Sequence, residues 1–297
     1  YILSVALAYS LINQLTIILT LNLKIMKTKN LFFAALAFVL LLSSTFSFAQ
    51  DDKRPMYLSV TTMYWNGDNA MSMDDWKAGE KEYMDKVTSK NEYIMWGGYF
   101  THLLTPNSNE VVYGQSYPNW EAMEKAAARS AELEKAAWPD ATKRAAFLKT
   151  QGNFYTSKHS DEIYTILPNA KNATFDPEKD MILYVRTSHF AYPENAPEEE
   201  FGKLRTEFVE NVIQKNDLIK GYYPHSHFWG HDSTEFIEAF FVESTDDLDD
   251  LASSNWKLIE QHWPDAEARK EFNQKMNKYF TGIHGDEVYT SIEQLRK

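Results

Sequence analysis

The sequence predicts an α+β protein in which one βαββαβ unit is written twice in tandem. When residues 56–167 (copy one) are written above residues 181–292 (copy two), the two stretches align without a gap at an offset of 125 residues. About one position in five is identical in this alignment, which indicates a duplication. Both copies also show strand and helix patterns in the same order. These observations predict two similar domains within one chain.

Each copy begins with a strand and a helix. Residues 56–65 and 181–190 are rich in β-branched and aromatic residues, as strands are. In copy one, Ser72 and Asp75 form the pattern of a capping box, and in copy two Pro197 precedes an acidic first turn. The buried stripe of each helix recurs at helical spacing. It consists of Trp76, Gly79, Tyr83 and Val87 in copy one, and of Phe201, Leu204, Phe208 and Val212 in copy two.

Two more strands and a broken helix follow in each copy. The strands are predicted over residues 93–104 and 110–117, and over residues 218–229 and 235–243. The second helix begins after Asn119 or Ser244, stops at a Trp-Pro pair and restarts with an aspartate as N-cap. These repeated stops are Trp138-Pro139-Asp140-Ala141 and Trp263-Pro264-Asp265-Ala266. We expect the last strand to begin near Glu162 in copy one and near Glu287 in copy two.

The order βαββαβ is the ferredoxin-like arrangement. With its broken second helix and its tandem copy, the chain resembles the dimeric α+β barrel superfamily over about residues 56–292. This superfamily includes antibiotic-biosynthesis-type monooxygenases, stress-responsive barrel proteins and chlorite dismutase-like haem proteins. The resemblance implies that the two domains pair about a pseudo-two-fold axis into one barrel within a single chain. It implies a fold and leaves the activity open.

The N-terminal region has the pattern of a secretory signal peptide. Residues 26–49 begin with Met26, continue with two lysines and an apolar run, and end in a small-x-small cleavage site before Gln50. Residues 1–25 are then expected to be an upstream, non-native segment. The alternative is that both apolar runs form a membrane hairpin. We expect an exported protein, periplasmic or secreted, that is not in the membrane after cleavage, with residues 168–180 as a polar linker between its domains.

Composition and missing motifs narrow the function classes. The net charge of −12 repels phosphate backbones, so a nucleic acid partner is not expected. The absence of cysteine excludes disulfides, iron–sulfur clusters and thiolate chemistry. The sequence also lacks a Gly-rich phosphate loop, HExxH and GxSxG, which argues against nucleotide-driven, zincin and α/β-hydrolase chemistry.

The duplication sorts the histidines into repeated and unrepeated ones. His102 is repeated as His227, and His159 as His284, whereas His189, His225 and His231 occur only in copy two. A residue found in one copy needs an explanation beyond the shared fold. We therefore predict that copy two is the specialised half, with His227, His225 and His189 as candidate catalytic residues. Candidate ligand-binding residues are His102, Tyr64, Tyr223, Trp229, His284 and Asp286.

His225 and His227 are two residues apart on a predicted strand, so they should point to the same face about 7 Å apart. We expect them to share a cavity if that face lines the pocket between sheet and helices, as the resemblance implies. Such a pair could also ligate a metal ion such as Zn²⁺, although polar pocket residues explain it equally well. Haem ligation by one of the histidines is a further alternative that the resemblance implies. The sequence otherwise indicates no cofactor.

The repeated segment His-x-Asp-Glu-x-Tyr-Thr allows two interpretations. His284 and Asp286, like His159 and Asp161 in copy one, could orient each other as an acid–base pair. We favour a structural corner, with each histidine near a helix C-terminus and each aspartate holding a turn.

Taken together, the patterns favour binding of a small, partly apolar molecule in the pocket of copy two. His189, His225 and His227 are its predicted polar contacts. The alternatives are a cofactor-independent monooxygenase or isomerase that uses the same histidines, a metal- or haem-binding barrel protein, and a non-catalytic scaffold whose pockets are filled. The two domains are expected to pair with each other, and further oligomerisation is left open.

Overall fold

The computed structural model describes residues 54–67, 72–172, 176–197 and 199–297. The predicted signal peptide at 26–49 and the segment 1–25 lie outside these residues. Among the described residues, no helix combines the length and the apolar character that crossing a bilayer requires.

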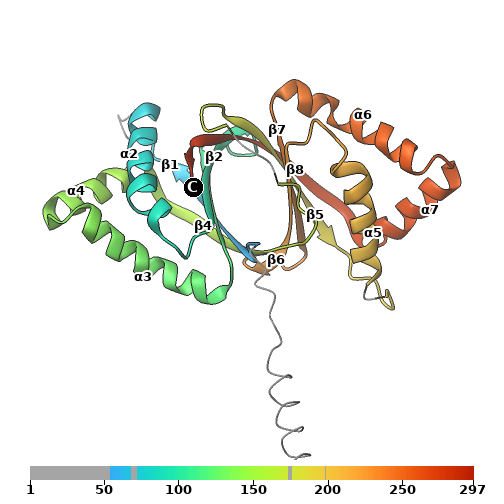
Figure 1. Cartoon of the computed structure of the whole chain (residues 1–297), viewed down its shortest axis with the longest axis horizontal. Helices are drawn as coiled ribbons and strands as arrows, with labels where there is room; N and C mark the ends of the chain where they lie inside the picture. The colour runs from blue at the N-terminus through green and yellow to red at the C-terminus, as the bar shows by residue number, and fades with distance from the viewer. Residues whose placement is uncertain (1–53, 68–71, 173–175, 198) are drawn as a thin grey trace, which may run out of the picture. The chain divides into compact units, whose positions relative to one another are not determined.

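The elements of both copies follow the predicted order (Figure 1). Copy one consists of β1 (Tyr57–Trp65), α2 (Met73–Lys86), a 3₁₀ turn (Thr88–Lys90), β2 (Trp96–Leu104), β3 (Glu110–Tyr117), α3 (Trp120–Ala137), α4 (Ala141–Gly152) and β4 (Tyr155–Ile166). Copy two consists of β5 (Met181–Phe190), α5 (Glu200–Phe208), a π-helical segment (Val209–Ile213), β6 (Gly221–Trp229), β7 (Glu235–Val242), α6 (Thr245–His262), α7 (Ala266–Asn277) and β8 (Phe280–Arg296).

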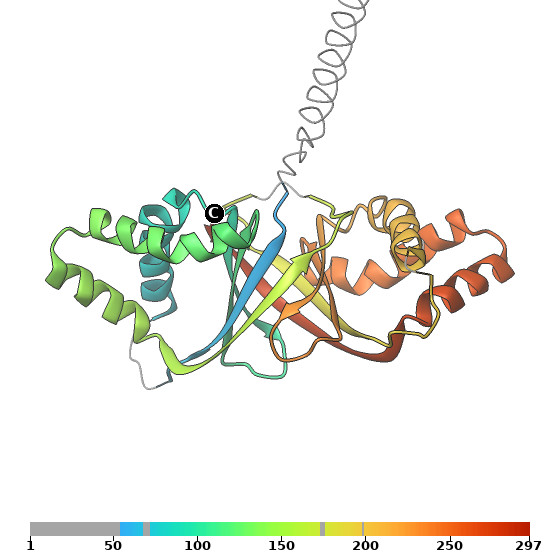
Figure 2. The same cartoon turned by 90° about the horizontal axis from the view of Figure 1, so that it is seen from below.

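The eight strands form one closed antiparallel barrel in the order β1-β3-β2-β8-β5-β7-β6-β4. Two pairings join the copies: β4 of copy one pairs with β6 of copy two, and β8 of copy two pairs with β2 of copy one. The long last strand of each copy is therefore shared between the two halves, and β8 runs as one red ribbon across Figure 2. The predicted pseudo-two-fold barrel within one chain is confirmed.

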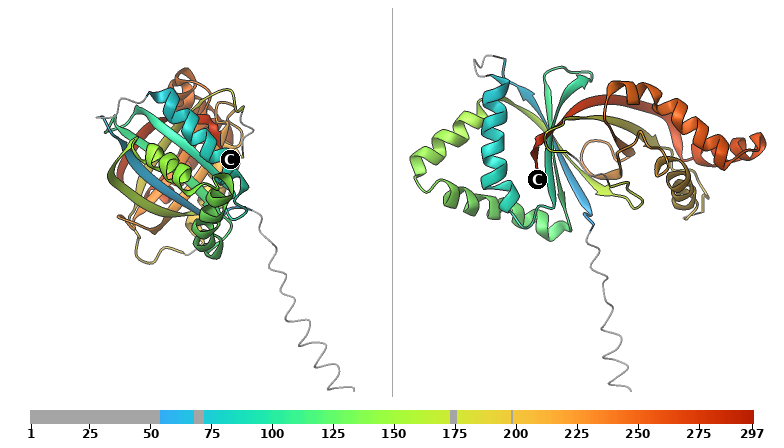
Figure 3. Two further views of the ribbon diagram at one scale, coloured as in Figure 1. Left: turned by 90° about the vertical axis from the view of Figure 1, so that its left-hand side faces the viewer. Right: turned by 45° about the horizontal axis from the view of Figure 1, so that its top comes forward.

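Each strand presents one face to the barrel interior and the other to the helices, which lie outside the barrel on two opposite sides (Figure 3). On β6, Tyr222 packs with Val209, Ile213 and Leu251 under the copy-two helices. Its neighbour Tyr223 packs against a separate buried cluster of residues from both copies, inside the barrel. The alternation along each strand therefore decides whether a side chain reaches the helices or the interior.

The predicted helix starts that depend on a capping side chain are confirmed by their hydrogen bonds, whereas α5 begins at Glu200, after the start predicted from Pro197, and has no side-chain cap. Ser72 and Asp75 form a capping box, and the side chains of Asn119 and Ser244 cap α3 and α6. After each Trp-Pro pair, Asp140 and Asp265 accept backbone N–H bonds at the starts of α4 and α7. The restart of the broken helix thus follows from the missing N–H of proline and from the aspartate cap.

The last strand of each copy begins earlier than the sequence predicts, at Tyr155 rather than near Glu162 and at Phe280 rather than near Glu287. Pairing explains the difference, since β4 pairs with β1 as far as Tyr155 and β8 pairs with β5 as far as Phe280. After the half-buried Tyr155 and Phe280, residues 156–161 and 281–286 are exposed and mostly polar, so they lack the apolar alternation that marks a strand in a sequence.

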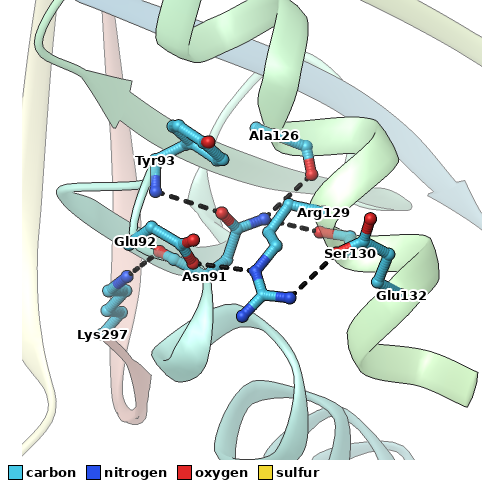
Figure 4. Close-up of polar contacts among 8 residues, drawn as sticks. All are labelled: Asn91, Glu92, Tyr93, Ala126, Arg129, Ser130, Glu132 and Lys297. Carbon is cyan, nitrogen blue, oxygen red and sulfur yellow. Dashed lines mark hydrogen bonds and ion pairs between the residues drawn. The ribbon is translucent and has the colours of Figure 1, made fainter. Parts of the chain in front are cut away.

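A buried asparagine in each copy accepts a hydrogen bond from a lysine that follows the last strand of the other copy. Asn91 has no exposed surface, and its amide donates to the Ala126 carbonyl and to Ser130 on α3 (Figure 4). Lys297, which follows β8, donates to the Asn91 carbonyl at 2.6 Å. In copy two, Lys171 donates to the carbonyl of the equivalent Asn216 at 2.8 Å. These two contacts add to the strand pairings that hold the copies together.

Candidate functional site

A cleft of about 700 Å³ lies in copy two between the outer face of β5, β7 and β8 and the helices α5, α6 and α7. Its apolar walls include Phe208, Phe240, Leu248, Leu251, Met276 and Phe280. Its polar side chains include Tyr184, Arg186, Ser188, Glu238, Asn255 and His284. Apolar walls with a few convergent polar groups are the usual composition of a small-molecule site.

The π-helical segment shapes one wall of this cleft. It directly continues α5, and in its wide turn the N–H of Gln214 donates to the carbonyl of Val209 at 2.8 Å. Phe208 and Ile213, which line the cleft, lie on either side of that turn. Copy one has no π segment among its described residues, since α2 runs to Lys86 and a 3₁₀ turn follows. Short π segments within helices are frequent at functional sites.

Asp286 organises the polar wall, where three side chains from two neighbouring strands approach its carboxylate. The Tyr184 hydroxyl donates to Oδ1 at 2.6 Å, and Nε2 of His284 lies 3.3 Å from Oδ2. Nε of Arg186 lies 4.0 Å from Oδ1. The wall therefore combines an imidazole, a guanidinium and a phenol around one carboxylate.

Glu238 lies on the other side of Arg186, because β7 pairs with β5 at this position. Burial raises the pKa of the Glu238 carboxyl, while a 2.6 Å hydrogen bond from the Tyr222 hydroxyl and the nearby Arg186 act in the opposite direction. Arg186 is thus placed between two carboxyl groups, Glu238 and Asp286.

In copy one, large side chains fill the equivalent space. Tyr99 stacks on Tyr113 with ring centroids 4.4 Å apart and meets Trp76 edge-on at 5.6 Å. The hydroxyls of Tyr99 and Tyr155 donate to the buried carboxyl of Glu80 at 2.6 and 2.9 Å. Burial raises the pKa of Glu80, and these two hydrogen bonds oppose that shift. The result is a closed, hydrogen-bonded aromatic core.

Copy two lacks this filling because its equivalent residues differ. The stacked pair of Tyr99 and Tyr113 is replaced by Pro224 and Glu238, at the offset of 125 residues. Tyr155 is replaced by Phe280, which has no hydroxyl, and the buried Glu80 is replaced by Arg205. Of these exchanged residues, Glu238 and Phe280 line the cleft of copy two, in place of Tyr113 and Tyr155.

His225 and His227 point to the same face, as predicted, but that face is the barrel interior. Both lie an even number of residues from Tyr223 on β6, so they share its inward face. The ring of His225 lies 6.4 Å from that of Tyr164 on β4. The expectation that they line the pocket between sheet and helices is therefore wrong, because the helices cover the opposite face of β6. The Nδ1 atoms of both are buried and have no hydrogen-bond partner among the described residues.

The other residues predicted from copy two's asymmetry also lie away from the cleft. His189 lies at the end of β5, with Nδ1 3.0 Å from the Thr234 hydroxyl and 3.3 Å from Asp232. Tyr223 is part of the barrel interior, and Trp229 is 70% exposed at the end of β6.

Two predicted residues of copy one face the barrel as well. His102 lies two residues after Phe100 on β2, and Phe100 belongs to the interior cluster. The Nδ1 atom of His102 lies 2.8 Å from the Thr105 hydroxyl. Tyr64 lies opposite Glu110 on the neighbouring strand β3, and the Lys158 ammonium is 4.4 Å from its ring centroid.

His284 lines the cleft and Asp286 lies next to it on β8, and the structural corner that we favoured for them is wrong. Both residues lie within β8, well after the end of α7, and each side chain is more than 40% exposed. Neither holds a helix end or a turn. His159 and Asp161 repeat the pair on β4 at 3.4 Å, with no arginine beside them, since Thr61 occupies the position of Arg186.

Sequence reasoning missed Tyr184, Arg186 and Glu238. The signal was available, because copy one has Ser59, Thr61 and Tyr113 at these positions. These cleft-lining residues that differ between the copies are not histidines, so a comparison of the histidines does not find them.

The described residues contain no group of three or more histidine, aspartate or glutamate side chains placed to hold a metal ion, so the predicted metal pair His225 and His227 lacks further ligands. Haem iron needs an axial ligand such as histidine. The histidine that lines the cleft is His284, and with its Nε2 next to Asp286 it could ligate only through Nδ1.

No protein-family model matches the sequence, and no curated protein matches it either. Solved structures do match. A putative monooxygenase from Fusobacterium nucleatum is 10% identical with a TM-score of 0.51, over 81% of this chain and 94% of the other. A putative monooxygenase from Lactobacillus acidophilus is 8% identical with a TM-score of 0.49, over 80% and 93% of the two chains. A mutant chlorite dismutase from Candidatus Nitrospira defluvii is 10% identical with a TM-score of 0.49, over 82% and 95%.

At such low identity the likeness concerns the fold alone. The closed barrel, the two βαββαβ copies and the likeness to the structure from Fusobacterium nucleatum agree. The chain has the dimeric α+β barrel fold, in a tandem form in which one polypeptide supplies both halves of the barrel.

Proposed function

We propose that the protein binds a small, uncharged and partly apolar molecule in the cleft of copy two. The observation that carries this proposal is the difference between the copies. They share one fold, but where copy one packs Tyr113 against Tyr99 in a buried aromatic core, copy two has Glu238 in the wall of a cleft of about 700 Å³. A scaffold role does not require such a difference.

The charges of the cleft favour an uncharged ligand. Arg186 lines it and has Glu238 beside it on β7 and Asp286 beside it on β8. A ligand that binds as an anion, with no proton to give to the site, would have to compete with these carboxyl groups for the guanidinium. A neutral molecule with hydrogen-bonding groups at one end and an apolar body fits both sides of the cleft.

Co-purification tests this proposal with a matched pair of substitutions. Ala252 lines the cleft on α6 and is exposed, and copy one has the exposed Ala127 at the equivalent position on α3. Tryptophan at position 252 should fill the cleft, whereas tryptophan at position 127 should project from a closed core. We expect mass spectrometry to find an organic molecule with wild type and Ala127→Trp, and a strongly reduced amount with Ala252→Trp. Equal amounts in all three proteins would contradict the proposal.

A cofactor-independent oxygenase or isomerase is the second candidate. The observation that favours it is the group of titratable side chains in the cleft wall, His284, Glu238 and Asp286. Monooxygenase is also the description of the fold neighbour from Fusobacterium nucleatum, which suggests the reaction class to assay. Oxygen uptake with an aromatic alcohol, present in wild type and lost in Ala252→Trp, would support this candidate.

Export remains part of the proposal, on the pattern of residues 26–49. N-terminal sequencing of the protein from its native host should find Gln50 as the first residue. A chain that retains residues 26–49 would contradict this.

A further inference from the structure

We infer that the copy-two cleft takes a molecule with a weakly acidic hydroxyl group, a phenol or an enol, and that His284 accepts its proton. This inference rests on the proposed binding site and adds the chemical class of the ligand and a role for one residue.

His284 has the position that a proton acceptor needs. It lines the cleft from β8, and its side chain is 41% exposed, so that a bound molecule can reach it. Nε2 lies 3.3 Å from Asp286, which leaves Nδ1 for the ligand. A carboxylate next to one ring nitrogen orients the imidazole and stabilises the imidazolium that forms when the other nitrogen takes up a proton.

Asp286 is itself held in place. The Tyr184 hydroxyl donates to Oδ1 at 2.6 Å, so the carboxylate keeps Oδ2 for His284. Burial raises the pKa of Tyr184, and the hydrogen bond to Asp286 adds to this, so the phenol remains a donor. Tyr184 is therefore a positioning residue for the pair of Asp286 and His284.

Arg186 provides the partner for the oxygen anion that the transfer leaves on the ligand. Before transfer, Asp286 is the nearest carboxylate to Nε of Arg186, at 4.0 Å. When the ligand O–H bond breaks and the N–H bond forms at Nδ1, the positive charge moves to His284 and the negative charge to the ligand oxygen. Asp286 then pairs with the imidazolium, and Arg186 can turn to the new anion. The charge of the site as a whole does not change.

Glu238 is the rival proton acceptor, because it lines the same cleft. It already accepts a hydrogen bond from the Tyr222 hydroxyl at 2.6 Å, and Arg205 on α5 lies close enough to affect its charge. The lining residues Asn255 on α6, and Met276 and Asn277 on α7, are uncharged. His284 and Glu238 are thus the two groups that an experiment must separate.

Copy one supplies a control within the same chain. His159 and Asp161 repeat the pair at 3.4 Å, but Thr61 replaces Arg186, and the aromatic stack of Tyr99 and Tyr113 fills the space beside the sheet. A His159→Gln variant therefore loses the same chemical group from the same type of strand without touching the cleft.

The test uses 4-nitro-1-naphthol, whose anion absorbs visible light, and its methyl ether, which has no proton to lose. Equilibrium dialysis of the ether measures binding, and absorbance against pH measures ionisation of the bound naphthol. We expect wild type and His159→Gln to lower the ionisation midpoint of the naphthol by about one pH unit or more. We expect His284→Gln to bind the ether within about twofold of wild type but to leave the midpoint at its free value.

The outcomes distinguish a failure of the binding proposal from a failure of the proton-transfer inference. If the ether does not bind to wild type, the binding proposal fails, and the inference fails with it. If the ether binds but the midpoint of the naphthol is unshifted, the inference alone is overturned. It is also overturned if Glu238→Gln abolishes the shift and His284→Gln keeps it. An Asp286→Asn variant, which should bind the ether and reduce the shift, provides a second check should His284→Gln fold poorly.

Discussion

Replacing His225 with phenylalanine should remove a loss of stability that the wild-type protein suffers in mild acid. Phenylalanine is the residue that copy one has at the equivalent position, Phe100, and both residues are buried inside the barrel. His225 is 5% exposed, and its Nδ1 has no partner among the described residues. Burial lowers the pKa of His225 from 6.5 to about 4.

The sign and size of the effect follow from this shift. The unfolded chain takes up a proton on His225 near pH 6.5, but the folded chain takes it up only near pH 4, so the unfolded state binds more protons between these values. The free energy of unfolding therefore falls as the pH drops from 6.5 towards 4. Below pH 4, His225 is protonated in both states and causes no further decrease. The full loss is about 3 kcal/mol, and about 2 kcal/mol of it is reached by pH 5.

Urea unfolding of wild type and His225→Phe at about pH 7.5 and about pH 5 measures this loss. Other buried groups, such as Glu235 and Glu287, have their pKa raised by burial and titrate in both proteins, so the comparison of the two cancels them. Wild type should lose about 2 kcal/mol more than the variant between the two pH values. Equal losses would show that His225 is not buried as a neutral imidazole and would refute the reasoning.

Five other substitutions test the fold. Asp140→Ala and Asp265→Ala each remove an N-cap and should lower the free energy of unfolding by about 1 kcal/mol, measured in urea, and no loss in either would argue against the capped restart. Asn91→Ala and Asn216→Ala each remove buried hydrogen bonds between loop and helix and should cost about 1–3 kcal/mol in the same assay. Tyr164→Phe removes the 2.9 Å hydrogen bond to Glu235, so the pKa of that carboxyl should rise in an NMR titration, and an unchanged pKa would contradict the contact.

The fold could be read from the sequence because the duplication tested each local pattern twice. The caps at Asp140 and Asp265 depend on a few neighbouring residues, so the sequence contains all the information that they need. The starts of β4 and β8 could not be predicted, because pairing with β1 and β5 decides them and their polar residues show no apolar alternation.

The site was harder to predict because a strand has two faces. The spacing of His225 and His227 shows that they share a face, but only the packing of Tyr222 under the helices decides which face lines the cleft. The space itself depends on side chains that are distant in the sequence. Glu238 lines it where copy one has Tyr113, stacked on Tyr99, and no pattern within one copy reveals that exchange.

The central claim is that copy two binds a small molecule and copy one does not. Equilibrium dialysis with the methyl ether of 4-nitro-1-naphthol measures the number of sites directly, in wild type, Ala252→Trp and Ala127→Trp. We predict about one molecule per chain for wild type and Ala127→Trp, and binding weakened roughly tenfold or more in Ala252→Trp. No binding to wild type, about two molecules per chain, or equal binding by both variants would contradict the account.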